Sequence, residues 1–290
     1  MKKVPKISRN AKFNSEKVSK GILSLIFLYV ITTIYIAFLS PNWLKLLETP
    51  LIAGGLISVV MWFPGIIGLL FAKNEGITLK VFAWPNRYFF LGPLFMLLLI
   101  LLSFVVSLPF VEVRNLEKLN LIQAFGILAG GYLLSLTGSM LFSLGEELYW
   151  RGYLWEKLRK FSPIRAIVIM GVLWGIWHWP FLIFLSQYVP KAPLLGTIYP
   201  NFPLIGCLLV LFNAVLLSFL FTYFRLKGKA IMASAAMHGM ASLGISFAWA
   251  VYANPVSFLI GMTGITGLVI AFLFCLFFKL FSKNTWKKLV

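Results

Sequence analysis

The sequence predicts an all-α membrane protein, a bundle of about eight transmembrane helices, and three observations support this fold class. The chain has 290 residues, of which 60% are hydrophobic and 17% aromatic, and its mean hydropathy is +0.92. Charged residues make up 12% of the chain, about half of the share in an average soluble domain. Eight separate stretches approach the ~20 mostly apolar residues that a membrane-spanning helix needs.

The first four apolar stretches lie at about 21–40, 50–72, 88–110 and 121–145. Seven basic residues precede the first of them, which is a pattern that signal peptides share. The apolar run is too long for a cleaved signal, and no small-residue cleavage site follows it. We therefore expect a transmembrane span behind a basic cytoplasmic tail at 1–20, which would contact anionic lipid.

The remaining apolar stretches lie at about 166–185, 203–224, 230–252 and 257–278. All segments between the stretches are short, so we expect residues 21–290 to form a single membrane domain. The two cysteines, Cys207 and Cys275, fall inside apolar stretches and give no sign of a disulfide framework.

The basic residues are unevenly divided between the two sides of the expected membrane. With eight spans, 22 of the 26 Lys and Arg fall on the side of the N-terminus, and the other four are Lys45, Arg114, Lys118 and Lys191. The positive-inside rule then places both termini in the cytoplasm. The net charge of +18 is explained by this topology, so the lipid bilayer is an expected partner and nucleic acid is not. Short loops and the absence of organelle signals favour a multi-pass protein of a prokaryotic plasma membrane over the endoplasmic reticulum.

A few ionisable residues lie inside or beside apolar stretches, where charge is costly and usually retained for function. Glu146 and Glu147 end the fourth stretch, His178 lies in the fifth and His238 in the seventh. A helical rise of ~1.5 Å per residue places His178 about 20 Å and His238 about 14 Å from the cytoplasmic ends of their helices. These depths make a cluster of Glu146, His178 and His238 feasible.

Glu147 and Arg151 are four residues apart on a continuous helix, so they share a face in the favourable order of acid before base. They could form an ordinary ion pair on a helix surface. Alternatively, Arg151 neutralises and orients Glu147, while Glu146, about 100° away around the helix, remains available as a base. Each histidine could likewise be a core residue that is hydrogen-bonded to a neighbouring helix.

Three motifs in the second half of the chain resemble those of a known family. They are Glu146-Glu147-Leu148-Tyr149-Trp150-Arg151, then Trp174-Gly175-Ile176-Trp177-His178, and then His238-Gly239-Met240-Ala241-Ser242. The sequence resembles the type 2 CAAX prenyl protease and bacteriocin-processing family of intramembrane proteases, called CPBP or Abi, over about residues 120–245. It departs from that family at Ser242, where Asn or Asp is usual, and at Trp174, where Phe is usual.

The resemblance implies an eight-helix membrane enzyme that cleaves peptide bonds near the cytoplasmic face. Carried over to this sequence, it makes Glu146 the base that activates water and His178 the group that holds the water and protonates the leaving amine. His238 would donate to the oxyanion. Ser242 would have to replace an amide with a shorter hydroxyl donor, and the loss of one oxyanion donor can cost ~100- to 1000-fold in rate. Asn213 is a second candidate for that donor.

No cofactor is expected, although a three-ligand zinc site of Glu146, His178 and His238 is an alternative. Metal-free chemistry is preferred because each ligand is alone on its helix, without the closely spaced His pair that organises helical zinc sites. Aspartyl proteolysis is excluded because the chain has no Asp, and the His-Glu-x-x-His motif is absent.

The leading hypothesis is an intramembrane endopeptidase that depends on glutamate and acts on a membrane-associated protein or peptide. Its substrate could be a CAAX protein, a bacteriocin or leader peptide, or a membrane-anchored regulator. The alternative is a non-catalytic membrane protein for bacteriocin self-immunity or scaffolding, which Ser242 favours. A transporter is less expected, because the polar residues cluster in one half of the chain and not in two repeated halves.

Overall fold

The computed structural model describes residues 15–38, 50–113, 120–160, 162–188, 203–251, 259 and 261–281. These residues are helical or in turns and loops and contain no β-strand, which confirms the predicted all-α class. Residues 1–14, most of the basic tail predicted at 1–20, lie outside the described residues.

The helices of the first half follow the predicted apolar stretches closely. In chain order they are α1 (Ser15–Phe38), α3 (Pro50–Asn74), α4 (Arg87–Ser107), a short 3-10 turn (Leu108–Phe110), α5 (Leu121–Ser135) and α6 (Gly138–Glu147). The fourth predicted stretch is not one straight helix, because it bends by 44° between α5 and α6. The bend falls at Leu136 and Thr137, between the C-terminus of α5 and Gly138, the first residue of α6.

The helical run that begins with α6 extends well beyond the apolar stretch. It passes through a π-helix, η4 (Leu148–Leu154), and ends with the short α7 (Trp155–Leu158). The motif Glu146 to Arg151 therefore spans the junction between an α-helix and a π-helix. Such π-helical turns are rare and are often found at functional sites.

The helices among the described residues of the second half are α8 (Pro163–Trp177), α9 (Trp179–Tyr188), α10 (Pro203–Gly228), α11 (Ile231–Val251) and α12 (Ile265–Phe281). The fifth predicted stretch is broken at His178, which caps the C-terminus of α8, and Pro180 then stands in the first turn of α9. The eighth predicted stretch begins later than expected, at Ile265, because a turn at Gly261 with a φ of 79° precedes the helix.

Several of these helices are suited to cross a membrane. Four are long and apolar enough over the described residues, at Ser19–Phe38, Arg87–Phe110, Pro163–Phe184 and Leu204–Gly228, and the bent pair of α5 and α6 would make a fifth. Shorter apolar helices lie at Ser58–Asn74, Ile231–Ile245 and Ile265–Lys279. The chain is therefore a multi-pass membrane protein by composition, while the count of eight spans and the cytoplasmic position of the termini stay predictions.

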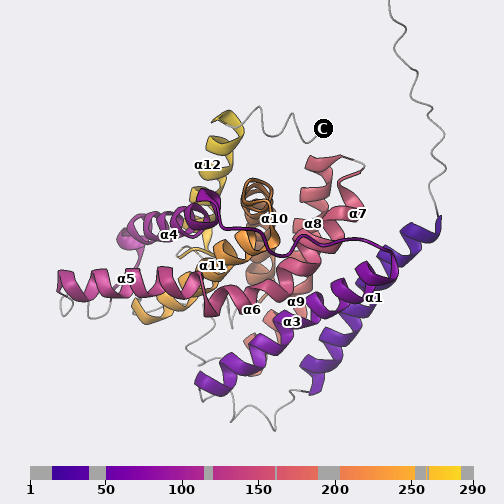
Figure 1. Cartoon of the computed structure of the whole chain (residues 1–290). Coiled ribbons are helices and arrows are strands. Elements are labelled where there is room, and N and C mark those ends of the chain that lie inside the picture. The colour runs from indigo at the N-terminus through magenta and orange to yellow at the C-terminus, as the bar shows by residue number, and fades with distance from the viewer. Residues whose placement is uncertain are drawn as a thin grey trace, which may run out of the picture.

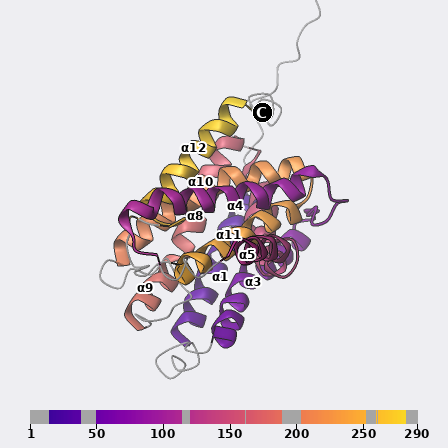
Figure 2. The same ribbon diagram turned by 90° about the vertical axis from the view of Figure 1, so that its left-hand side faces the viewer.

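The helix that carries the acidic motif lies between most of the others. α6 packs against α3 and α11, α11 packs against α4 and α10, and α10 packs against α8 (Figure 1). α1 lies beside α3 on the outside of the bundle. The view turned by 90° shows α4 passing across α11, and α12 extends above both of them in this view (Figure 2).

Two glycines let α3 and α6 meet backbone to backbone. A Cβ atom on Gly145 would lie 2.4 Å from the carbonyl oxygen of Met61, and one on Gly65 would lie 2.7 Å from the carbonyl oxygen of Gly145. Small residues permit this kind of close approach between membrane helices. This contact holds Gly145, which directly precedes Glu146, against the backbone of α3.

Candidate active site

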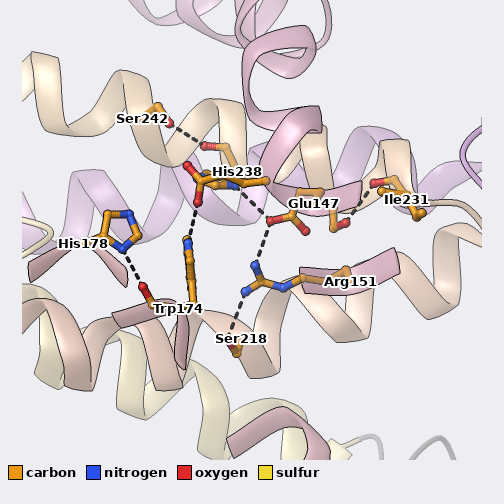
Figure 3. A network of polar contacts seen from close by, with 10 residues as sticks. Glu147, Arg151, Trp174, His178, Ser218, Ile231, His238 and Ser242 are labelled. Carbon is orange, nitrogen blue, oxygen red and sulfur yellow. Dashed lines mark hydrogen bonds and ion pairs between the residues drawn. The ribbon is translucent and has the colours of Figure 1, made fainter. Parts of the chain in front are cut away.

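The structure brings the predicted ionisable residues together from three parts of the chain (Figure 3). Glu146 and Glu147 end α6 and Arg151 lies in the π-helix, while His178 stands at the α8–α9 break and His238 lies inside α11. The two glutamates and Arg151 are at most 2% exposed, and His238 is 6% exposed. His178 is partly exposed.

Glu147 is the centre of a buried charge network. Its Oε1 atom accepts one hydrogen bond from Nη1 of Arg151 at 2.9 Å and another from Nδ1 of His238 at 3.0 Å. The Glu147–Arg151 pair is fully buried, so it is not the surface ion pair that the spacing alone would also allow. Burying such a pair is costly unless further hydrogen bonds hold both groups.

Arg151 obtains this further support from α8 and α10. Its guanidinium lies 4.4 Å from the ring of Trp174 and 4.9 Å from the ring of Phe221, so it contacts two neighbouring aromatic rings. Its Nη2 atom donates to the hydroxyl of Ser218 at 3.0 Å. Cation–π contacts gain strength where water is excluded, and these contacts fix the cation that faces Glu147.

Glu146 has different partners from its neighbour in sequence. Its Oε2 atom accepts a hydrogen bond from the indole Nε1 of Trp174 at 2.5 Å. Within the described residues Glu146 forms no ion pair, whereas Glu147 forms two. The two adjacent carboxylates therefore occupy distinct chemical surroundings, as expected for side chains about 100° apart on a helix.

The hydrogen bonds of the two histidines determine which ring nitrogen is free. Nδ1 of His238 faces a carboxylate, and Nδ1 of His178 lies 2.8 Å from the carbonyl oxygen of Trp174. Both partners only accept hydrogen bonds, so both Nδ1 atoms carry a proton. The Nε2 atom then carries a lone pair if the ring is neutral and a proton if the ring is charged. Neither Nε2 atom has a hydrogen-bond partner among the described residues.

Trp174 contacts Glu146, Arg151 and both histidines. Besides its contacts to Glu146 and Arg151, its ring centroid lies 5.5 Å from that of His178 and 5.3 Å from that of His238. His178 lies within electrostatic range of Glu146, His238 and Arg151. Both histidines therefore pack against the indole of Trp174.

Ser242 lies one turn beyond His238 on α11, as its spacing predicts. Its hydroxyl donates to the backbone carbonyl of His238 at 3.2 Å (Figure 3). This bond to the preceding turn is common for serine in helices, and the hydroxyl would have to leave it to donate elsewhere. Asn213 is engaged away from the cluster, since its Nδ2 atom donates to the carbonyl of Met262 at 2.8 Å.

The grouping of possible metal ligands bears on the zinc alternative. Within the described residues, no three side chains of His, Cys, Asp or Glu are grouped so that they could hold a metal ion. Glu146, His178 and His238 therefore surround Trp174 without forming a three-ligand metal site.

The end of the helical run is fixed by ion pairs outside the cluster. Lys157 pairs with Glu75 at the end of α3, and Tyr153 donates to the same carboxylate at 2.6 Å. Glu156 pairs with Arg225 of α10 at 3.0 Å. These contacts tie α7 to α3 and α10, so the π-helix is held at both of its ends.

Two residues of the cluster were given no chemical role from the sequence, although Trp174 belongs to the second motif and was expected to line a pocket. Trp174 stands four residues before His178, so helical spacing alone would have placed both on one face of α8. Ser218 is one serine within a long apolar helix, and nothing in the sequence links it to Arg151.

Two comparisons with known proteins point to the same family. Residues 128–244 match the family described as type II CAAX prenyl endopeptidase Rce1-like, and this range contains all six predicted site residues. The chain is also similar to "CAAX prenyl protease 2" of Methanococcus maripaludis, with 27% identity over 181 residues, which are 57% of this chain and 64% of that relative. The chain thus matches less than two thirds of the length of that relative. Together with the motifs, these matches make residues 128–244 similar to the family of type II CAAX prenyl endopeptidases.

Proposed function

We propose that this chain is an intramembrane endopeptidase that hydrolyses a peptide bond of a membrane-associated protein or peptide. The observation that carries the proposal is the surroundings of Glu146, whose buried carboxylate has one oxygen held by Trp174 and lies in the same cluster as two histidines with free Nε2 atoms. Amide hydrolysis needs a base for water, a proton donor for the amine and donors for the oxyanion. This cluster contains a candidate for each role.

In the first step, Glu146 accepts a proton from water while the water oxygen attacks the carbonyl carbon of the substrate. The electron pair of the carbonyl bond moves onto its oxygen, which becomes the oxyanion. The hydrogen bond from Trp174 to Oε2 leaves Oε1 of Glu146 to face the water. A carboxylate held in one orientation needs no reorganisation before it takes the proton.

In the second step, the bond between carbon and nitrogen breaks and the leaving amine takes up the proton that Glu146 removed from water. His178 passes this proton through its Nε2 atom, because its Nδ1 proton is held by the carbonyl of Trp174. The products are a carboxylate-terminated fragment and an amine-terminated fragment, so one water molecule is consumed for each bond cleaved.

His238 stabilises the oxyanion as an imidazolium, because only the charged ring carries a proton at Nε2 when Nδ1 is also protonated. Glu147, 3.0 Å from Nδ1, supplies the counter-charge for that ring, and Arg151 keeps Glu147 in place. In this scheme Glu147 and Arg151 are positioning residues. Ser242 contributes a second donor only when its hydroxyl leaves the carbonyl of His238.

The proposed substrate class follows from the position of the site and from the relatives. The cluster is buried within apolar helices, so a substrate reaches it from the membrane or its surface. The matched relative is named a CAAX prenyl protease, and we propose a CAAX-like protein or a leader-bearing peptide as the substrate. A prokaryotic plasma membrane is the proposed location.

The decisive experiment compares membranes that carry the wild type, Glu146→Gln or His238→Ala. Peptides shortened at a terminus are identified by mass spectrometry, and we expect them only with the wild type. A matched control is Glu156→Gln, which removes a carboxylate outside the cluster and should leave the peptides unchanged. Identical peptide profiles and phenotypes for all variants would contradict the protease and favour the non-catalytic immunity or scaffolding role.

A further inference from the structure

Basic side chains near one end of the helix bundle fall into two groups. Lys157 pairs with Glu75, and Arg159 and Arg225 both pair with Glu156. Arg87 and Lys227 have no carboxylate partner within the described part of the chain. These two cations lie instead on one tyrosine ring, that of Tyr88.

Arg87 and Lys227 both lie against the ring of Tyr88. The guanidinium of Arg87 lies 5.0 Å from the ring centroid of Tyr88, and its Nη2 atom donates to the Tyr88 hydroxyl at 3.2 Å. The Nζ atom of Lys227 lies 5.8 Å from the same centroid and 5.9 Å from that of Tyr223. Asn86 joins the two helix ends, because its Nδ2 atom donates to the carbonyl of Lys227 at 3.1 Å.

This group has an uncompensated positive charge. Arg87 is the first residue of α4, whose first turn contains no acid. The partial positive charge of the α4 N-terminus is offset by the partial negative charge of the α10 C-terminus beside Lys227, so the excess charge is that of the two side chains. Two cations on one ring repel each other, so an anion between them would lower the electrostatic energy of the group. A phosphate fits best, because Arg donates to it in a bidentate manner and Lys adds a point charge.

The position of the group favours a lipid as the source of the phosphate. Arg87 begins the candidate span Arg87–Phe110, and Lys227 lies one residue before the end of the candidate span Leu204–Gly228. Both cations are therefore at the level where the headgroups of a leaflet lie. The loop before α4 also exposes Phe82 at 64% and Trp84 at 93%, and aromatic residues of this kind are enriched at the membrane–water boundary.

We propose that Arg87, Tyr88 and Lys227 form a binding site for the phosphate headgroup of an anionic phospholipid. The headgroup lies between the two cations at the junction of α4 and α10. This site is separate from the buried cluster around Glu146, so it does not depend on the proposed peptidase activity.

The test measures lipid bound to the purified full chain in detergent by native mass spectrometry. Phosphatidylglycerol and phosphatidylcholine are added in equal amounts to the wild type, to Arg87→Gln/Lys227→Gln and to the matched control Lys73→Gln/Arg165→Gln. The control removes two exposed cations from other helices. A cation near an anionic lipid surface contributes roughly a fivefold increase in affinity, so we expect the first double variant to bind phosphatidylglycerol about 30-fold more weakly and the control to bind as the wild type does.

Three results would overturn the proposal. The first is an equal loss in both double variants, which would indicate general surface charge. The second is a wild type without preference for phosphatidylglycerol. The third is displacement of the lipid by millimolar inorganic phosphate, which would assign the site to free phosphate. Should the double variant fail to fold, Arg87→Gln alone gives the same comparison with an expected loss of about fivefold.

Discussion

α5 and the helical run from α6 into the π-helix come from neighbouring parts of one apolar region, yet α5 is mostly exposed and the run is mostly buried. In α5 only Ser135 is buried, and Leu121 and Phe125 are 89% and 73% exposed. Every residue from Ser143 to Trp155 is buried. In Figure 1, α5 extends outward from the bundle, whereas α6 passes into its middle.

The difference shows that apolar composition alone does not decide which membrane helix becomes the core. Lipid is as apolar as leucine, so apolar side chains gain little from leaving lipid for protein. The buried run differs from α5 in having polar groups that need partners, Glu146, Glu147 and Arg151, and a glycine in backbone contact with α3. Packing and hydrogen bonding therefore explain the burial of the run better than hydropathy does.

The largest expected effect comes from Glu146→Gln, which keeps the shape of the side chain and removes the base. Loss of a general base costs up to about 10,000-fold in rate, so we expect kcat to fall to near the background rate while the protein stays folded. Peptide release from a membrane-anchored reporter measures the change. A variant that retains a tenth of wild-type activity would refute the assigned role of Glu146.

Arg151→Met should give the next largest effect, on stability. The change leaves Glu147 buried with one cation fewer, and breaking such a pair costs about 3–5 kcal/mol. Arg159→Met is the matched control, because the Arg159 side chain is 48% exposed in its pair with Glu156 and exposed pairs contribute about 0–1 kcal/mol. Unfolding of both variants in detergent measures the two losses, and equal losses would show that burial adds nothing to the Glu147–Arg151 pair.

Trp174→Phe keeps the ring and removes the hydrogen bond to Glu146. A hydrogen bond to a charged group contributes about 1.5–3 kcal/mol, so we expect kcat to fall about 10- to 100-fold with KM nearly unchanged. Trp177→Phe is the matched control, since its indole donates to Thr32 at 2.9 Å and not to the cluster. A similar decrease in kcat for both variants would mean that Trp174 acts by packing alone.

The smallest expected effect is that of Phe125→Ala in α5, below about 0.5 kcal/mol, as for surface positions in general. Leu148→Ala at the start of the π-helix removes a side chain that is 3% exposed and should cost about 2–5 kcal/mol. Unfolding in lipid nanodiscs compares the two. If Phe125→Ala destabilised the protein as strongly as Leu148→Ala, the contrast between the two regions would be wrong.

The helices themselves were largely predictable, because an apolar run of about 20 residues has few other structures available in a membrane. The bend near Thr137 and the break at His178 were not, because both depend on packing between helices that are distant in the sequence. Of the two, only the break at His178 has a signal in the sequence, which is Pro180 in the first turn of α9.

Of the candidate site, the sequence predicted which residues meet but not how they are bonded. The spacing of Glu147 and Arg151 predicts their contact, whereas the bond from His238 to Glu147 joins residues 91 positions apart. The link from Trp174 to Glu146 likewise depends on how α8 packs on α10 and on the π-helix η4. Such contacts follow from the tertiary arrangement, so no local pattern reveals them.

The backbone contact between α3 and α6 also limits how the protein can move. With no side chain between Gly65 and Gly145, the two helices have no rotamers to change, so they are expected to shift as one rigid unit. A substrate would then have to enter through another gap between helices. α5 is the least buried helix beside α6 and meets it at a bend of 44°, so the route of entry is best sought there.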